Sequence, residues 1–176
     1  MSVKNLLHNL PLPAGQLTGM AAVALLDRFR AARLPGPRMA RGAAGPALMA
    51  AGCVFISWAL SERRRHAVDG FDLERPQTLV TTGPYALSRH PMYVGWWFIH
   101  LGFGVLRGSA WVFITVPLAV LAEHRGVLAE ERMLVQAFGP QYLNYAERVP
   151  RYVSLARVMS FAERWFTPQR ATARSA

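Results

Sequence analysis

The stretch that decides the fold is PMYVGWWFIHLGFGVLRGSAWVFITVPLAVLA, which runs from Pro91 to Ala122. It holds two apolar blocks, and only Arg107 and Gly108 separate them. Each block is short for a membrane span, but with its flanks it approaches the roughly 30 Å of a bilayer core. Proline suits the first turn of a helix, and glycine suits the bend that follows one. The pattern therefore predicts a tight helical hairpin, with a kink at Pro117 in its second arm.

Two further apolar blocks precede this hairpin, a weak one at 12–26 and a stronger one at 43–60. Apolar residues make up 52% of the 176 residues and charged ones only 17%, against roughly 25% charged in soluble domains. The charges lie between the blocks, as expected where a charge at mid-bilayer costs about 3 kcal/mol. We therefore predict an all-α, polytopic integral membrane protein. It would have about four membrane helices, including the hairpin, and amphipathic C-terminal helices.

The net charge of +10 comes from nineteen arginines and one lysine. Because these arginines stand beside apolar blocks and no nucleic-acid-binding motif is evident, we expect membrane lipids as partners and no nucleic acid. Arginines are abundant both in 28–41 and in 61–90, so the positive-inside rule leaves the topology of the first block open. The single cysteine, Cys53, excludes a disulfide framework, and we expect it to be buried. No metal-ligand spacing is present, so no metal site is expected.

Composition divides the chain into three parts. Residues 1–60 hold the N-terminal membrane helices, and residues 168–176 are expected to form a disordered tail. Between them, 61–167 form the expected catalytic region: a polar loop, the hairpin and the amphipathic helices. A short helix at 141–149, after Gly139 and Pro140, would put Tyr142, Tyr145 and Val149 on one side.

Counting along the hairpin brings polar residues together. His90 lies 18 residues before Gly108, and Glu130 lies 22 residues after it. Since an α-helix rises 1.5 Å per residue, Glu130 and Glu131 land about one turn beyond His90. The residues that this spacing gathers at one membrane–water boundary are His90, Glu130, Glu131, Tyr85, Tyr93 and Arg125.

Each of these residues also has a purely structural explanation. His90 before Pro91 can simply start a helix, and the two glutamates can form a solvated helix face. Tyr93, Trp96 and Trp97 can belong to an interfacial aromatic belt. The glycines at 95, 102 and 104 are most simply a close helix-packing surface.

Two longer motifs resemble the isoprenylcysteine carboxyl methyltransferases. The first is LVTTGPYALSRHPMYVGWW at 79–97, and the second is EERMLVQAFGPQYLNYAERVPR at 130–151. With their flanks they cover 77–152, a little under half of the chain. The wider family includes phospholipid N-methyltransferases, which share the His-Pro and Glu-Glu elements but are less similar to this chain at Arg-Val-Pro-Arg.

The resemblance implies S-adenosylmethionine as the cofactor and Glu130 as the carboxylate that contacts it. The family's arginine four residues before that glutamate corresponds to Gly126 here, and Arg125 stands one place earlier. The catalytic assignment is therefore Glu130, with Arg125 or Arg148 holding a substrate carboxylate. The positions that match cofactor contacts are Gln77, Thr78, Leu79, Val80, Tyr85, His90, Pro91, Met92, Tyr93 and Glu130.

The resemblance also implies the reaction, which would be methylation of the carboxylate of an isoprenylcysteine-like or other apolar-tailed substrate. The catalytic side would face the cytoplasm from the cytoplasmic membrane, because S-adenosylmethionine is made in the cytosol. A phospholipid amine or a small apolar thiol is an alternative acceptor, which would need deprotonation and would leave Arg125 and Arg148 without a carboxylate. A non-enzymatic membrane scaffold or lipid-binding protein is the alternative from another class, and it predicts no cofactor binding.

Overall fold

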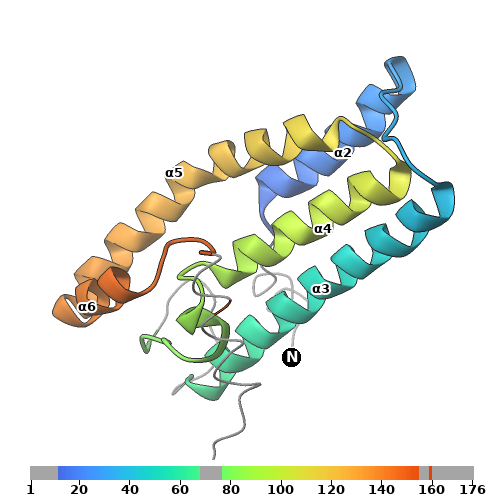
Figure 1. Ribbon diagram of the computed structural model, residues 1–176. Helices are drawn as coiled ribbons and strands as arrows, with labels where there is room; N and C mark the ends of the chain where they lie inside the picture. Colours follow the sequence, from blue (N-terminus) through green and yellow to red (C-terminus); the bar gives the residue numbers. More distant parts are fainter. Residues whose placement is uncertain (1–11, 68–76, 155–158, 160–176) are drawn as a thin grey trace, which may run out of the picture.

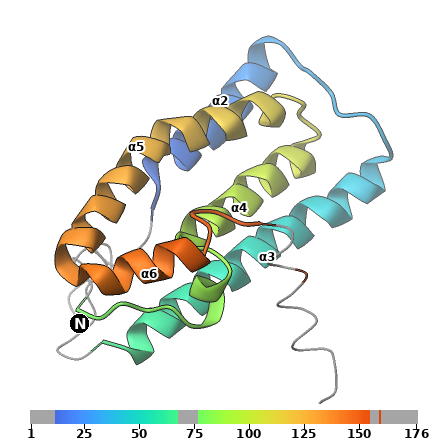
Figure 2. The same ribbon diagram turned by 60° about the vertical axis from the view of Figure 1, so that its left-hand side comes forward.

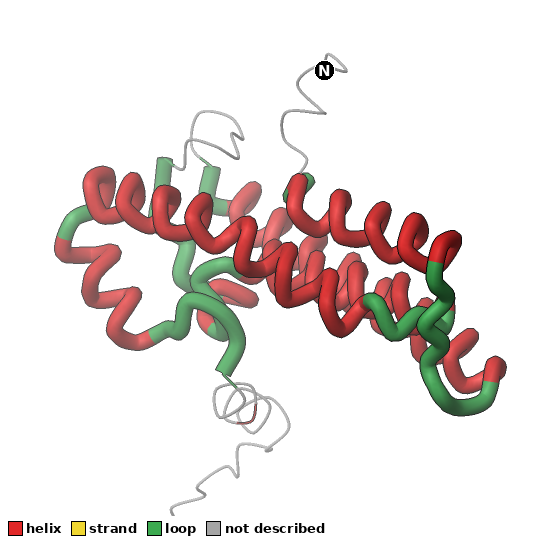
Figure 3. Tube along the Cα trace, turned by 90° about the horizontal axis from the view of Figure 1, so that it is seen from above, coloured by secondary structure: helices red, strands yellow, loops and turns green. Residues whose placement is uncertain are grey.

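The computed structural model describes residues 12–67, 77–154 and 159, and this part of the chain is helical (Figure 1). Figure 3 shows only helices and loops in the described residues. An isolated antiparallel bridge pairs Arg33 with Ser109. The predicted all-α class is confirmed for the described residues. The elements in chain order are α2 (Ala14–Phe29), α3 (Arg38–Arg65), the 3-10 helix η1 (Gly83–Ala86), α4 (Pro91–Arg107), α5 (Val112–Phe138) and α6 (Pro140–Arg148).

Helices α4 and α5 form the predicted hairpin. Pro91 takes the first position of α4, where its missing N–H leaves no hydrogen bond unmade. Gly108 ends α4 in the left-handed conformation, with φ 65°, which glycine adopts without a Cβ clash. Helix α5 then returns beside α4 and continues through Pro117 (Figure 1). The hairpin brings the C-terminal part of α5 back toward the start of α4.

Helix α3 runs antiparallel beside α4, and glycines bring the two backbones into contact (Figure 2). A Cβ atom on Gly102 would lie 2.7 Å from the carbonyl oxygen of Gly45, and one on Gly95 would lie 2.9 Å from that of Gly52. Such approaches are possible only without side chains, as in membrane helix pairs with small residues at their interface. The predicted close packing of the three glycines is confirmed: Gly95 and Gly102 pack against α3, and Gly104 packs against the start of α5.

Two described helices, α3 and α5, are long and apolar enough to cross a membrane. They have 28 and 27 residues, with mean hydropathies of 1.7 and 1.5 over their most apolar segments. Helix α2 has 16 residues and α4 has 17, and α2 packs on α5 and α4. The structure thus supports two of the roughly four predicted spans, and the other two stay predictions.

The expected burial of Cys53 is wrong, because the residue is exposed on α3. Helix α3 turns Gly52 toward α4, and the next residue along a helix points about 100° away from that face. Cys53 therefore lies where a bilayer would cover it.

Helix α6 folds back on the end of α5. Gly139, with φ 50°, ends α5, and Tyr142, Tyr145 and Val149 form one buried cluster, as predicted. The hydroxyl of Tyr145 donates to the carbonyl oxygen of Tyr85 at 2.7 Å. Helix α6 is thereby tied to the loop that leads into α4.

The predicted division of the chain remains a prediction. Helix α3 runs to Arg65 without a break, so the expected boundary at residue 60 falls inside a helix. The tail at 168–176 lies outside the described residues.

Candidate active site

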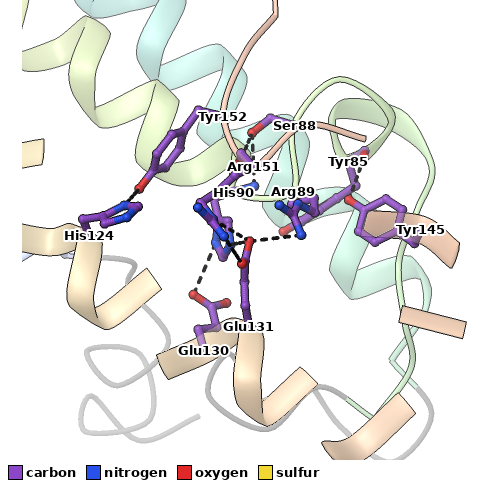
Figure 4. A network of polar contacts seen from close by, with 10 residues as sticks. All are labelled: Tyr85, Ser88, Arg89, His90, His124, Glu130, Glu131, Tyr145, Arg151 and Tyr152. Carbon is purple, nitrogen blue, oxygen red and sulfur yellow. Dashed lines mark hydrogen bonds and ion pairs between the residues drawn. The ribbon is translucent and has the colours of Figure 1, made fainter. Parts of the chain in front are cut away.

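His90 is the centre of a buried polar cluster where α4 begins (Figure 4). Its Nδ1 atom lies 3.4 Å from Oε2 of Glu130, and its Nε2 atom lies 3.3 Å from Oε1 of Glu131. The backbone N–H of His90 donates to Oγ of Ser88 at 3.1 Å. The predicted convergence of His90 with both glutamates is confirmed, and the imidazole lies between two consecutive carboxylates of α5.

Glu131 is the most constrained carboxylate of the site. Nε of Arg151 donates to both of its oxygens at 3.0 Å, and Nη2 donates to Oε2 at 2.8 Å. Nη1 of Arg89 lies 3.3 Å from Oε1. Three cationic or protonatable groups therefore surround one carboxylate that is only 10% exposed.

Arg151 reaches the cluster because the segment after α6 pairs with the segment before α4. The N–H of Arg89 donates to the carbonyl oxygen of Pro150 at 3.0 Å, and that of His90 donates to the carbonyl oxygen of Arg151 at 3.2 Å. The hydroxyl of Ser88 donates to the same Arg151 oxygen at 3.1 Å. The two motifs of the sequence thus meet through their backbones.

The neighbouring charges favour the ionised forms of His90 and Glu131. Both residues lie outside the apolar part of α5. Burial alone would raise the pKa of Glu131, but hydrogen bonds from His90 and Arg151, helped by the charge of Arg89, lower it to about 2. Burial of His90 opposes protonation, yet its bonds to Glu130 and Glu131 outweigh that effect and raise its pKa above the ordinary value. The site therefore favours an imidazolium held between two carboxylates.

Aromatic rings form one wall beside His90. The centroid of Tyr93 lies 5.9 Å from that of His90, and Tyr152 lies 6.4 Å from it. Tyr152 also packs on Trp97 at 4.8 Å, and its hydroxyl bonds to Nδ1 of His124 at 2.9 Å. Trp97 is half-buried against Tyr152, and its assignment to an interfacial belt stays a prediction.

The other predicted cofactor positions lie in or near the packed loop before α4. Val80 and Tyr85 are buried with Ala59, and Met92 packs against them. Leu79 packs against the Tyr142 cluster, and Oγ1 of Thr78 donates to the carbonyl oxygen of His66 at 2.7 Å. Of the predicted positions, the structure gathers His90, Tyr93 and Glu130 at the His90 cluster, with Pro91 adjacent. The others belong to the supporting loop and the core beneath it: Gln77, Thr78, Leu79, Val80, Tyr85 and Met92.

The structure does not bring Arg125 and Arg148 to the cluster. Both are exposed, and neither contacts His90, Glu130 or Glu131. Nε of Arg148 instead donates to the carbonyl oxygen of Asn144 on its own helix, at 2.9 Å. The arginines beside Glu131 are Arg89 and Arg151, which the Arg-His-Pro and Val-Pro-Arg motifs contain.

A cavity of about 500 Å³ opens beside Arg89 and Glu131. Its walls come from the polar end of α5 and from α6, with apolar side chains next to Arg89 and Arg132. The residues that line it are Arg89, Leu128, Glu131, Arg132, Val135, Gln136, Tyr142, Leu143 and Ala146. The lining of the cavity thus combines charged side chains with largely apolar ones.

The fold and the site together define a helical protein with candidate membrane spans and a histidine–carboxylate–arginine cluster at one end. The phospholipid methyltransferase family matches residues 40–141, which is more than half of the chain. The chain belongs to this family.

Curated proteins with similar sequences narrow the comparison within the family. The chain is 40% identical to protein-S-isoprenylcysteine O-methyltransferases of Mus musculus and Homo sapiens, over 42% of this chain and 26% of each relative. It is 41% identical to the cobalt-zinc-cadmium resistance protein CzcN of Cupriavidus metallidurans, over 43% of this chain and 35% of that protein. The chain therefore spans between a quarter and about a third of the length of these relatives. No solved structure matches it.

Proposed function

We propose that this chain is an S-adenosylmethionine-dependent membrane methyltransferase that methylates the carboxylate of an apolar-tailed acceptor, such as an isoprenylcysteine. The observation that carries the proposal is the clamp of His90 between Glu130 and Glu131, with aromatic rings on one side and arginines on the other. Family membership and the named methyltransferases among the relatives support the same class of reaction.

The residues at the aromatic wall fit a sulfonium cofactor. The Glu130 side chain is 38% exposed and has His90 as its charged neighbour, so it can meet a second cation. The rings of Tyr93 and Tyr152 can face that cation, since aromatic faces attract positive charge. The indole N–H of Trp97 is buried without an acceptor among the described residues, and a polar ligand atom would satisfy it. When bound, S-adenosylmethionine supplies an electrophilic methyl group on a positively charged sulfur.

The residues on the other side of His90 fit an anionic acceptor with an apolar tail. Nε of Arg89 is buried without a hydrogen-bond acceptor among the described residues, and this side chain lines the neighbouring cavity. An acceptor carboxylate can bind there, while its tail lies along Leu128, Val135 and Leu143. A carboxylate is already ionised near neutral pH, so the site needs no strong base.

The chain's own groups then have distinct roles in the proposed reaction. Glu130 orients the methyl donor and offsets its charge, which is greatest before transfer. Glu131, fixed by Arg151, holds the His90 ring in place beside Glu130. Arg89 would hold the acceptor carboxylate, and in-line transfer requires one of its oxygens to reach the methyl group past the edge of the His90 ring. We propose that this end of the bundle faces the cytoplasm, where the methyl donor is made.

Calorimetric titration of S-adenosylmethionine and S-adenosylhomocysteine into detergent-purified protein tests the donor site. The wild type should bind both, and Glu130→Ala should weaken S-adenosylmethionine binding by tenfold or more, which corresponds to about 1.4 kcal/mol. Glu147→Ala is the matched control, since Glu147 is an exposed glutamate of α6. A well-folded wild type that binds neither ligand would overturn the proposal and favour a scaffold or lipid-binding protein.

The acceptor is tested separately, by transfer of a labelled methyl group to a farnesylated cysteine. Base-labile label in the product, as expected for a methyl ester, would support a carboxylate acceptor. Transfer only to a phospholipid amine would support the methyltransferase activity but refute the assignment of a carboxylate acceptor.

A further inference from the structure

The end of the bundle opposite to His90 is an ordered platform. There the connection between α2 and α3 lies against the turn between α4 and α5 (Figures 1 and 2). The N–H of Leu34 donates to the carbonyl oxygen of Gly108 at 2.9 Å, and the N–H of Ala110 donates to the carbonyl oxygen of Ala32 at 2.7 Å. The indole N–H of Trp111 donates to the carbonyl oxygen of Arg30 at 2.8 Å. The connection is therefore fixed to the hairpin.

This platform presents four exposed arginines, Arg28, Arg30, Arg33 and Arg38, which we call the basic end. None of the four forms an ion pair with any described residue. Among the described residues, the acidic side chain nearby is Asp27, and it is already engaged: Oγ of Ser109 donates to it at 2.8 Å, and Nε of Arg107 lies 3.5 Å from it. The four guanidinium groups thus lack protein counter-charges among the described residues, unlike Arg89 and Arg151 at the other end.

Large apolar side chains stand among these arginines. Leu25 is 57% exposed, Phe29 is 79% exposed and Met39 is 88% exposed. They lie near the ends of α2 and α3, and the end of a helix that enters a bilayer would meet the phosphate layer. Cationic groups beside exposed apolar groups at a helix end match the chemistry of a lipid headgroup above its acyl chain.

We propose that the basic end binds the phosphate groups of anionic phospholipids, with Phe29 and Met39 against their acyl chains. A guanidinium group can donate two hydrogen bonds to one phosphate, and four such groups without ion-pair partners among the described residues favour a lipid of net negative charge over a zwitterionic one. The proposal is independent of the methyl-transfer site, because every residue it uses lies at the opposite end of the bundle.

Trp111 is a reporter at the basic end, since its indole contacts the backbone of Arg30. The protein is reconstituted with phosphatidylcholine that contains either brominated phosphatidylglycerol or brominated phosphatidylcholine, and quenching of tryptophan fluorescence is measured. The contribution of Trp111 is the difference between the wild type and Trp111→Phe. We expect brominated phosphatidylglycerol to quench Trp111 at a concentration at least about tenfold lower than brominated phosphatidylcholine.

Charge variants decide whether the arginines cause this preference. Replacement of the four arginines by glutamine should abolish it, while replacement by lysine, the matched control, should keep most of it because the charge remains. Rising salt should weaken it in the wild type. If the quadruple glutamine variant does not fold, the double variant Arg28→Gln, Arg38→Gln should show a partial loss.

Four results would overturn the proposal, two on the lipid preference and two on the source of the anion. One is equal quenching of wild-type Trp111 by the two lipids, and another is an unchanged preference in the folded glutamine variant. The other two concern the source of the anion. If glycerol phosphate or inorganic phosphate in solution displaced the lipid at millimolar concentration, the basic end would be a site for soluble anions. If an acidic peptide displaced it, the basic end would be a protein-binding surface.

Discussion

Arg151 holds both carboxylate oxygens of Glu131, with its Nη2 atom 2.8 Å from Oε2 and its Nε atom 3.0 Å from Oε1. This two-pronged contact joins the segment after α6 to α5, and it occurs where Glu131 also meets His90. A planar guanidinium group matches a carboxylate in this way, whereas a lysine ammonium can offer only a point charge. The contact therefore fixes the orientation of the carboxylate as well as its charge.

Replacing Arg151 should destabilise the protein. Arg151→Ala leaves a largely buried carboxylate with fewer donors, and the loss should be about 1–3 kcal/mol of unfolding free energy. Thermal melting in detergent measures it. Arg148→Ala removes an exposed arginine that bonds only within α6, and its effect should stay within about 0.5 kcal/mol. Equal melting temperatures for the two variants would show that the contact contributes little.

The unfolding free energy should depend on pH through Glu131 and His90, whose contributions change in opposite directions as the pH rises. The pKa of Glu131 is lowered to about 2, so its contribution is present above the ordinary glutamate pKa near 4.3 and is lost as the pH falls from there toward 2. The pKa of His90 is raised, so its contribution is present below the ordinary histidine pKa near 6.5 and is lost as the pH rises through the folded-state pKa.

Melting temperature measured against pH should therefore fall on both sides of a maximum. Glu131→Gln should flatten the acid side, and His90→Asn should flatten the neutral-to-alkaline side. An unchanged acid limb in Glu131→Gln would assign that limb to other carboxylates.

The ring of Tyr152 should matter more than its hydroxyl for binding the methyl donor. Tyr152→Phe keeps the packing on Trp97 and the approach to His90, and loses only the hydrogen bond with His124. Tyr152→Ala removes the wall that would face the sulfonium. Calorimetry should show a small change for the first variant and a loss of about fivefold to thirtyfold for the second, which corresponds to about 1–2 kcal/mol. A loss of similar size in Tyr152→Phe would assign the effect to the hydroxyl instead.

Arg89 and Arg148 separate two assignments of the acceptor site. If the cavity beside Arg89 holds the acceptor carboxylate, Arg89→Gln should raise the acceptor KM at least tenfold while the Kd of the methyl donor changes little. The interpretation from sequence alone predicts the larger effect for Arg148→Gln or Arg125→Gln. Steady-state kinetics with a varied acceptor distinguish these outcomes.

The sequence predicts the hairpin and the meeting of His90 with the glutamates because both depend on local features. A proline, a glycine and the rise per residue of a helix are enough to place Glu130 and Glu131 near His90. The packing of Gly95 and Gly102 is predicted for the same reason, since glycines on one helix face indicate a close neighbour.

The arginines of the site were not predictable in this way. Residues three or four apart share a helix face, and Arg125 stands five residues before Glu130 and six before Glu131, so its side chain leaves α5 in another direction. Arg151 lies beyond α6 and reaches Glu131 only because its segment pairs with Arg89 and His90 through backbone hydrogen bonds. That pairing joins residues about 60 positions apart and has no local signal in the sequence.

A buried hydrogen-bonded chain inside the bundle provides the last prediction. Nε2 of Gln16 donates to Glu123 at 2.9 Å, so its Oε1 atom is the one that faces Nδ1 of His100, also at 2.9 Å. His100 must therefore donate from Nδ1, and its Nε2 atom accepts from the hydroxyl of Thr115 at 3.0 Å. His100 and Gln16 have no exposed surface, and the chain joins α2, α4 and α5.

The stability losses caused by two substitutions, compared with each other, test this hydrogen-bonded chain. Thr115→Val keeps the shape of the side chain and removes one donor, which should cost about 1 kcal/mol. Gln16→Leu leaves both the Nδ1–H group of His100 and a Glu123 oxygen without a partner, and each unsatisfied buried group costs about 1–3 kcal/mol. Melting in detergent should therefore show a larger loss for Gln16→Leu than for Thr115→Val. The reverse order would mean that water or lipid reaches Gln16, and that α2 is held on the bundle by its apolar contacts alone.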